Sequence, residues 1–394
     1  MIALLSLLLA ALGFAVFLIV IFFALEIAAS FFHRAPGAPP AGPRGSIAVV
    51  IPAHDEEAGI GATVAAARAQ LAAGDHILVV ADNCSDNTAA AARAAGADVA
   101  ERHDADHRGK GYALQHGVDA LRAAPPEIVV FLDADCDAAP GAIDRIARLA
   151  IDRERPVQAL YLARPAGEAG PASAVSAFAW LLLNRVRMTG LQTIGGFSRL
   201  TGSGMAFPWP LAAERRFATG EIVEDLAMTV ALIGEGTPPF LDTSAVVESE
   251  LARSGSGAAT QRARWELGSL RLAVRQAGGL FAKGLSGDWR ALLMAFDLLV
   301  PPLTVLGAVI VLGCLVSIPF ALAGRQAPLA LFWDAGLLFA VTIGVAWFAY
   351  GRTVLPPKTL AGLGDYLLGK LRVYGGEGRD SARRWTRTDR GDEK

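Results

Sequence analysis

The sequence predicts an α/β domain with a mainly parallel sheet and helices on both faces, flanked by helices that span a membrane. From residue 46 onward, apolar β-branched runs alternate with alanine-rich helical stretches, a rhythm typical of parallel sheets. Near both ends of the chain, apolar residues instead form runs of about 20 or more, long enough to cross a bilayer.

The elements of the predicted sheet domain follow one another in a βαβα order. The expected strands are 46–52, 76–81 and 127–132, with a shorter strand-like stretch at 97–101. The expected helices are 60–72, 86–95, 110–123, 141–151 and 226–233. Since ligands of open α/β sheets bind beyond the carboxyl ends of the strands, the residues directly after each strand are the candidates for chemistry.

Three apolar runs are the candidate membrane spans. Ile2–Ile27 contains one charged residue, Glu26, and no Lys or Arg precedes it. This run is longer than the apolar core of about 7–15 residues in a cleaved signal peptide, so we interpret it as an anchor. Leu303–Leu322 and Leu329–Tyr350 are separated by a short linker and form an expected helical hairpin. Asp334, inside the last run, is expected to be solvated.

The orientation of the spans follows from the basic residues beside them. Lys and Arg residues cluster after the first and last spans, whereas none precedes the first span and only Arg325 lies in the hairpin linker. The positive-inside rule therefore places the N-terminus outside and the α/β domain inside. We expect a multi-pass protein of the inner (cytoplasmic) membrane whose catalytic domain faces the cytoplasm.

These patterns divide the chain into six expected segments. They are an N-terminal membrane anchor (1–32), a Pro/Gly linker (33–45), the α/β catalytic domain (46–275), an interfacial connecting segment (276–302), a transmembrane hairpin (303–350), and an interfacial helix with a basic tail (351–394). Within the last segment, leucines recur at helical spacing over Thr359–Tyr374. That helix either lies in the membrane interface or packs on the domain.

Composition excludes several other classes of protein. The net charge is −2, so no basic field indicates a nucleic-acid partner. The three cysteines are Cys84, Cys136 and Cys314, and they lie far apart without C-x-x-C spacing. This pattern indicates neither a disulfide framework nor a zinc site. We therefore interpret the three cysteines as reduced thiols.

Polar and acidic residues follow three of the expected strands. They lie in the segments 52–57, 82–86 and 133–137. Because the strands are parallel, these clusters should meet at one edge of the sheet. Clustered carboxylates repel each other unless a cation or a donor is present. Asp133 and Asp135 suit Mg²⁺ or Mn²⁺, which completes its coordination shell with diphosphate oxygens and water.

Some of these polar residues have a structural alternative. Asp86 can cap the helix that follows it, and Asp137 before Pro140 is expected to be a turn or cap residue. The His-Asp-Ala-Asp-His segment 103–107 is interpreted as a solvated loop. Lys110 lies between two glycines at a helix start, which fits neither a P-loop nor a dinucleotide motif but can meet a phosphate or a base.

Two downstream segments supply further candidates. Glu224 and Asp225 open a helical stretch, and Gln261–Trp265 lies in a basic helical stretch. Transfer from a diphosphate donor requires a metal, a base, a cation and an aromatic face. The Asp133/Asp135 pair would hold the metal, and these two segments would supply the other groups. These segments also have structural alternatives. Asp225 would then be a charge at a helix N-terminus, Trp265 a core aromatic and Arg262 a surface cation.

The order of the motifs resembles the inverting family 2 glycosyltransferases, close to the membrane synthase-like branch with the cellulose, chitin and hyaluronan synthases. The matching segments are PAHDEE (52–57), DNCSDNT (82–88), RGKGYAL (108–114), DADC (133–136), TGSGM (201–205), VEDL (223–226) and QRARW (261–265). Five or more motifs in the same order make this a specific signal.

The resemblance implies a GT-A nucleotide-diphospho-sugar fold and a role for each matching residue. The donor-binding residues would be Pro52, Glu56, Asp82, Lys110, Asp133, Gln261 and Arg264. The metal, Mg²⁺ or Mn²⁺, would be held by Asp133 and Asp135. Asp225 would be the catalytic base. The acceptor-binding residues would be Gly204, Met205, Glu224 and Trp265.

The expected activity is inverting transfer of a sugar, from a nucleotide sugar such as a UDP-sugar, to a lipid-linked or polysaccharide acceptor. Polysaccharide export proteins are candidate partners. Relatives commonly have a second acidic residue where this chain has Asn83, and three spans are few for a channel that secretes polymer. One alternative is a non-catalytic GT-A-fold subunit of a polysaccharide assembly complex. Another, a nucleotidyltransferase, would need a basic, Gly-rich loop where the acidic segment 54–57 lies.

Overall fold

The structure is a computed structural model that describes residues 1–164, 171–250 and 256–362, with the side chains of 171–172, 256–264 and 360–362 outside the description. The described residues form two compact units. A helical unit contains 1–33, 171–194 and 269–362, and a sheet unit contains 34–164, 195–250 and 256–268. The division differs from the expected continuous domain 46–275, because the apolar helical segment 171–194 packs with the helices of the first unit.

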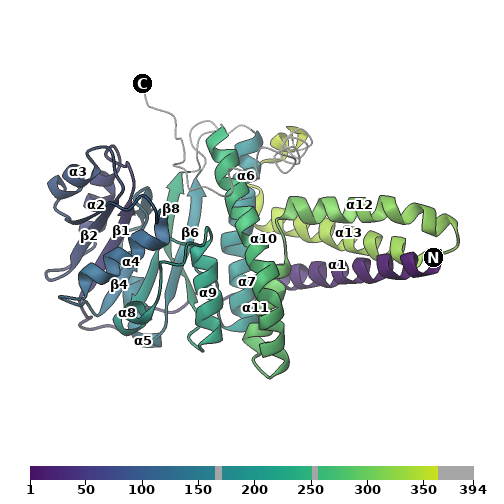
Figure 1. The fold of residues 1–394 in the computed structure, drawn as a ribbon, viewed down its shortest axis with the longest axis horizontal. Coiled ribbons are helices and arrows are strands. Elements are labelled where there is room, and N and C mark those ends of the chain that lie inside the picture. Colours follow the sequence, from purple (N-terminus) through teal and green to yellow (C-terminus); the bar gives the residue numbers. More distant parts are fainter. Residues whose placement is uncertain (165–170, 251–255, 363–394) are drawn as a thin grey trace. The chain divides into compact units, whose positions relative to one another are not determined.

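The sheet unit confirms the predicted mainly parallel α/β architecture (Figure 1). Its strands are β1 (Ile47–Ala53), β2 (His76–Asp82), β3 (Asp98–Arg102), β4 (Ile128–Phe131), β5 (Cys136–Ala138), β6 (Val157–Arg164), β7 (Met205–Pro208) and β8 (Phe240–Glu250). They lie in the order β3-β2-β1-β4-β7-β6-β8-β5. The pairs among β1 to β4 and the β6–β8 pair are parallel, whereas β7 and β5 run antiparallel to their neighbours.

Helices cover both faces of this sheet, because the strand order reverses between β1 and β4 and right-handed crossovers then fall on opposite sides. The helices are α2 (Ile60–Arg68), α3 (Thr88–Ala94), α4 (Lys110–Leu121), α5 (Ala142–Arg153), α8 (Trp209–Glu214) and α9 (Glu224–Gly234). On one face, α4, α8 and α9 enclose a core with β1, β2, β4 and β7. Phe131, Phe207 and Phe217 stack edge to face at its centre, so the strand ends rest on a rigid base.

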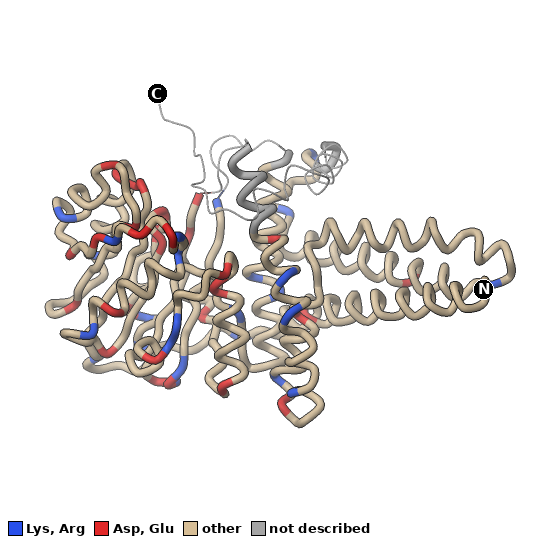
Figure 2. Tube along the Cα trace, viewed as in Figure 1, with Lys and Arg blue, Asp and Glu red and all other residues tan. Residues whose placement is uncertain are grey.

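The helical unit contains three helices that are long and apolar enough to cross a membrane. They are α1 (Ile2–Ser30), α12 (Leu303–Leu322) and α13 (Ala327–Ala346), the last extended to Gly351 by the π-helix η2 (Trp347–Gly351). They pack side by side and carry almost no charge (Figure 2), as their sequences predict. Asp334 is exposed on α13, and its solvation stays a prediction.

The remaining helices of the chain are α6 (Pro171–Leu181), π-helix η1 (Leu182–Arg187), α7 (Met188–Gly195), α10 (Ser256–Leu285), α11 (Trp289–Leu299) and the short 3₁₀ helix η3 (Pro357–Gly362). Most of the interfacial helix expected at Thr359–Tyr374 lies outside the described residues. Its position therefore stays a prediction.

A buried ion cluster lies in the helical unit. Arg187, at the end of η1, donates to the carboxylate of Glu26 at 2.7 Å and to that of Asp297 at 2.8 Å. All three residues are at most 5% exposed. Burial opposes the charged guanidinium, but the two carboxylates outweigh it and raise the pKa of Arg187 further. The cation therefore ties α1, η1 and α11 together.

Replacement of Arg187 by Met is expected to destabilise the helical unit by about 3–5 kcal/mol, because two buried carboxylates lose their common cation. Thermal unfolding in detergent would measure the loss. Arg185→Met is the matched control, since Arg185 is exposed on the same π-helix and lies 5.9 Å above the ring of Tyr350. Equal destabilisation by both substitutions would contradict a special role for the buried cluster.

Candidate functional site

The predicted site residues gather at the switch point of the sheet. After β1 the chain moves outward to β2 and β3, and it then returns to place β4 on the other side of β1. Pro52 lies at the end of β1, Asp82 ends β2 and Asp133 closely follows β4. Since β1, β2 and β4 are parallel, these residues share one edge, where α/β sheets bind their ligands. The expected convergence of the first-half motifs is therefore confirmed.

Asp82 is held in place by a residue that the sequence did not single out. Arg102, at the end of β3, donates to the Asp82 carboxylate at 2.6 Å. Asn83 also donates its side-chain amide to Asp82 at 2.9 Å, a bond that a second carboxylate at position 83 could not form. The backbone N–H of Glu56 donates to Thr88 Oγ1 at 2.7 Å and links the ends of β1 and β2.

The segment 103–107 is a loop, as predicted, and it supports Arg102. The carboxylate of Asp104 accepts hydrogen bonds from Arg102 at 3.0 Å and from the backbone N–H of His107. His103 and Asp106 are exposed. The segment thus organises the loop beside Asp82.

Asp133 and Asp135 form the oxygen-rich part of the site. Ligand atoms of Asp133, Asp135 and Cys136 lie within 4.8 Å of one another, with Asp135 exposed. Two carboxylates at this separation are suitable ligands for Mg²⁺ or Mn²⁺. Burial raises the pKa of Asp133, and the charge of Asp135 adds to this effect, whereas Lys110 opposes it. Such mutual repulsion favours a bound cation.

Lys110 connects the acidic pair to the second half of the domain. It begins α4, and its Nζ lies 2.5 Å from Asp133 Oδ1 and 2.8 Å from the carbonyl oxygen of Gly202. Burial lowers the pKa of Lys110, but the nearby carboxylates of Asp133, Glu224 and Asp225 outweigh burial and raise it. The lysine is therefore a permanent cation at the centre of the site.

Asp225 lies on the other side of Gly202. A Cβ atom added to Gly202 would lie 2.9 Å from Lys110 Nζ and 3.5 Å from Asp225 Oδ2, and the φ of Gly202 is +85°. Only glycine combines this backbone conformation with such close approach. Lys110, Asp133 and Asp225 therefore surround one point, although they come from three distant parts of the chain.

The electrostatic environment suits Asp225 for proton transfer. Burial raises its pKa above the ordinary value, and the cations Lys110 and Arg199 oppose that shift. Burial and the adjacent Asp225 charge raise the pKa of Glu224 to about 8. A carboxylate whose pKa is moved toward neutrality can accept a proton more effectively at physiological pH.

The raised pKa of Glu224 predicts a pH-dependent stability difference. An unfolded Glu ionises near pH 4.5, whereas folded Glu224 ionises near pH 8, so the wild type loses stability as pH rises through this window. Glu224→Gln removes this ionisable group. The Tm of the variant minus the Tm of the wild type is therefore expected to increase from pH 5 to pH 8. Differential scanning at both values measures it. A difference that shrinks with rising pH would contradict the assignment.

The loop that carries Gly202 is held by Gln158, a buried polar residue in apolar strand β6. Its side-chain amide donates to the Ser203 carbonyl at 2.7 Å and accepts from the Thr201 backbone N–H at 2.8 Å. Ser203 Oγ in turn accepts the Asp133 N–H at 3.0 Å. A polar residue within the largely apolar run Val157–Leu162 is the sequence signal for this support.

Gly204 and Met205 lie inside the fold. A Cβ on Gly204 would lie 2.8 Å from Val247 Cγ2, and Met205 is 3% exposed in the core. The Met205 side chain borders a cavity of about 10 Å³ together with Glu224 and Asp225. This burial favours a supporting role beneath Glu224 and Asp225 over the acceptor contacts that the sequence predicted.

The QRARW segment lies on α10. The side chains of Gln261 and Arg264 are outside the described residues, so their roles stay predictions. Trp265 is 37% exposed, so it is not the buried core aromatic that the structural alternative predicted. Gly268, one helical turn later, lies against Val223 and Ile222, so α10 passes directly beside the segment that leads into Glu224 and Asp225.

Two structural alternatives can now be settled. Asp86 is not the N-cap of α3: the N-cap is Asn87, and Asp86 lies one residue earlier, where its Oδ1 accepts the backbone N–H of Thr88 at 2.9 Å. Asp137 is neither a turn nor a cap residue, and that prediction was wrong. It is the exposed central residue of β5 and pairs with Glu248 of β8. Three residues are too few to show an alternating pattern, which is why the sequence did not reveal this strand.

Comparisons with known proteins agree with this geometry. The family described as "Glycosyltransferase like family 2" matches residues 43–268. A search of curated proteins finds no match.

Among solved structures, the chain is similar to mannosyltransferase PcManGT from Pyrobaculum calidifontis, in complex with GDP-Man and Mn²⁺. The identity is 17% over 96% of this chain and 99% of that chain, with a TM-score of 0.52. Glucosyl-3-phosphoglycerate synthase from Mycobacterium tuberculosis matches with 20% identity over 56% of this chain and 76% of that chain, at a TM-score of 0.36. The likeness to PcManGT extends over nearly the whole chain and supports a GT-A fold for the sheet unit.

Proposed function

The chain belongs to the glycosyltransferase-like family 2, and from this premise we propose that it is a membrane-anchored inverting enzyme that transfers a sugar from a nucleotide sugar to a lipid-linked or polysaccharide acceptor. The observation that carries the proposal is the meeting of Lys110, Asp133 and Asp225 around Gly202. A non-catalytic subunit would have no need of a half-buried cation and two carboxylates held around one point.

The donor binds across the ends of β1, β2 and β4. Pro52, Glu56 and Asp82 line the edge that suits a nucleoside, and Asp82 is oriented by Arg102. Asp133 and Asp135 would hold Mg²⁺ or Mn²⁺, which would supply positive charge to the leaving diphosphate. Lys110 adds a second, permanent positive charge beside it.

Asp225 acts as the catalytic base. Its carboxylate removes the proton of the acceptor hydroxyl, the acceptor oxygen forms a bond to the anomeric carbon, and the bond from that carbon to the diphosphate oxygen breaks. The nucleoside diphosphate leaves on the opposite side, and the configuration at the anomeric carbon inverts. The cationic Lys110 near Gly202 stabilises the negative charge that accumulates on the leaving group.

The acceptor approaches from the part of the site near Glu224 and Trp265. The partly exposed indole of Trp265 offers an aromatic face to a sugar. Three apolar helices tether the enzyme to a membrane, which favours a lipid-linked or growing polysaccharide acceptor. The distribution of basic residues supports an inner-membrane topology with the catalytic domain in the cytoplasm, where a polysaccharide export complex could receive the product.

Purified protein in detergent tests the activity directly. It is incubated with a panel of UDP- and GDP-sugars and with Mn²⁺ or Mg²⁺, and release of nucleoside diphosphate is followed with and without lipid or glycan acceptors. GDP-mannose belongs in the panel because PcManGT was solved with GDP-Man and Mn²⁺. Binding of nucleotide without turnover of any donor would instead support a non-catalytic subunit.

A further inference from the structure

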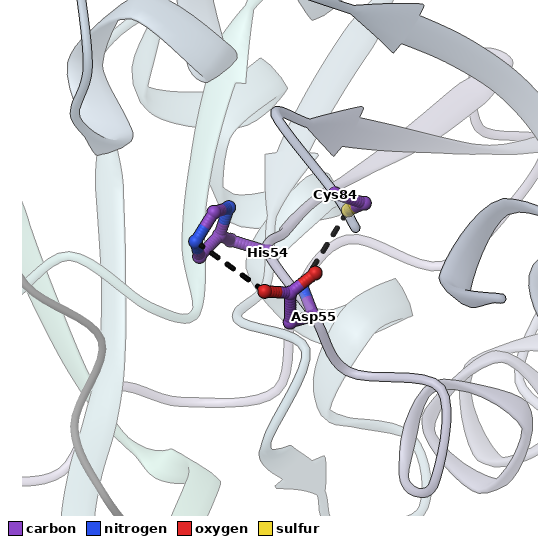
Figure 3. A group of neighbouring side chains, drawn as sticks. All are labelled: His54, Asp55 and Cys84. Carbon is purple, nitrogen blue, oxygen red and sulfur yellow. Dashed lines mark hydrogen bonds and ion pairs between the residues drawn. The ribbon is translucent and has the colours of Figure 1, made fainter. Parts of the chain in front are cut away.

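A second group of potential metal ligands lies at the ends of β1 and β2. His54 and Asp55 directly follow β1, and Cys84 lies two residues after β2. Their side chains are drawn together in Figure 3, where the dashed lines join Asp55 to both other residues. One nitrogen, one carboxylate oxygen and one sulfur from these residues all lie within 4.8 Å of one another.

We propose that His54, Asp55 and Cys84 form a binding site for a thiophilic divalent cation of the zinc class, distinct from the oxygen-rich site at Asp133 and Asp135. Imidazole, carboxylate and thiolate are the usual ligands of Zn²⁺, whereas Mg²⁺ and Mn²⁺ prefer oxygen. Three protein ligands leave a tetrahedral ion one further position for water.

The distance between His54 and Asp55 fits this coordination. His54 Nε2 lies 3.8 Å from Asp55 Oδ2. Two ligands bound at about 2.0–2.2 Å to a tetrahedral zinc ion are roughly 3.3–3.6 Å apart, so a small side-chain rotation brings both to one ion. The two side chains are 19% and 17% exposed, which leaves the ion a path from solvent.

His54 is already oriented as a metal ligand. Its Nδ1 lies 2.6 Å from the carbonyl oxygen of Asp82, which can only accept a hydrogen bond. In neutral imidazole the proton must therefore be on Nδ1, and the lone pair is on Nε2, facing Asp55. A carbonyl partner on the second ring nitrogen is the usual support of a metal-binding histidine.

Asp55 and Cys84 are held by the same two loops. Asp55 Oδ1 accepts the backbone N–H of Ser85 at 2.6 Å, and Cys84 Sγ accepts the backbone N–H of Asp55 at 3.4 Å. Burial raises the pKa of the Cys84 thiol, and the hydrogen bond from this N–H partly opposes the rise. Asp55 and Asn83 have φ values of 54° and 53°, a left-handed conformation that costs an L-residue roughly 1–2 kcal/mol. The two loops thus hold the three side chains together, although Asp55 and Asn83 must adopt an unfavourable left-handed backbone conformation.

The proposed site differs from the zinc sites that spacing along the sequence can indicate. Spacing along the sequence excluded a C-x-x-C type zinc site, but here the ligands come from two strand ends 28 or more residues apart, as the hydrogen bonds between them show. Such a site becomes visible only once β1 and β2 are known to be parallel neighbours.

The position of the site indicates a regulatory consequence, which rests on the proposed function. His54 and Asp55 lie between the proposed donor contacts Pro52 and Glu56, and His54 bonds to the carbonyl of Asp82. A cation bound here occupies the edge where the nucleoside would bind. Zinc and the nucleotide sugar are therefore expected to compete, while Mn²⁺ at Asp133 and Asp135 supports turnover.

Cobalt spectroscopy tests the site without any need for turnover. Co²⁺ added to the full chain in detergent is expected to show the visible bands of tetrahedral Co²⁺ and a near-ultraviolet sulfur-to-cobalt charge-transfer band, and Zn²⁺ should abolish both. Cys84→Ser should lose the charge-transfer band, and His54→Gln should bind Co²⁺ at least about tenfold more weakly. Cys136→Ser, which removes the thiol near Asp135, is the matched control and should keep the band.

The proposal fails if stoichiometric Co²⁺ gives no charge-transfer band, or if the band follows Cys136 and not Cys84. Inhibition by zinc is the second arm: with Mn²⁺ in excess, Zn²⁺ should raise the apparent donor KM of the wild type and leave that of Cys84→Ser much less affected. Equal inhibition of both proteins would overturn the competition. Since the spectra do not depend on activity, failure of the metal site and failure of the proposed function remain distinguishable.

Discussion

Asp225→Asn is expected to lower kcat for sugar transfer by about 10²–10⁴-fold, the usual range for removal of a general base. The amide keeps the size of the side chain but cannot take the proton of the acceptor hydroxyl. Nucleotide binding should stay close to the wild-type value, because the proposed nucleoside contacts lie on β1 and β2 and not on α9. Steady-state rates and nucleotide titration of the same preparation measure the two effects separately.

The control for Asp225→Asn is Asp119→Asn, which removes an exposed carboxylate on α4 that pairs with Arg122 on the surface. It should leave kcat unchanged. A pH profile gives a second readout: the acidic limb of the wild-type profile, set by ionisation of the base above the ordinary pKa of Asp, should disappear in Asp225→Asn. Wild-type turnover by this variant would remove Asp225 from the mechanism.

The parts of the protein that the sequence predicted well depend on local composition. The three spans follow from run length, and β1 and β2 agree with prediction to within one residue because their apolar runs are bounded by glycine and acidic residues. The convergence of Asp82 and Asp133 followed from the geometry of parallel strands alone.

The parts that the sequence could not predict depend on contacts between distant residues. The sequence did not single out Arg102, because nothing local shows that β3 places it against Asp82. Arg187 lies in an ordinary helical pattern, and only packing reveals that it neutralises Glu26 and Asp297. Gln158 supports the site through two backbone groups, and a single polar residue in an apolar strand does not show which partners it will meet.

The acidic pair at the end of β4 gives the other large expected effect. Asp135 is the better of its two residues to test, because Asp133 is ion-paired with Lys110 at 2.5 Å and its loss would leave that cation without its partner. Asp135 is exposed, so Asp135→Ala should not change the fold. Its loss removes a ligand from the expected Mn²⁺ or Mg²⁺ site while Lys110, Asp133 and Asp225 stay in place.

Asp135→Ala is expected to lower turnover by about 10²–10³-fold, as removal of one electrostatic stabiliser of the leaving group typically does. Its Mn²⁺ affinity, measured by isothermal titration, should fall in parallel, because one carboxylate alone holds the ion weakly. Asp137→Asn is the matched control, an exposed carboxylate two residues away in β5 that should leave both quantities unchanged. If Asp135→Ala kept full activity at low Mn²⁺, the diphosphate would have to be neutralised by the chain's own cations, with Lys110 the first of them.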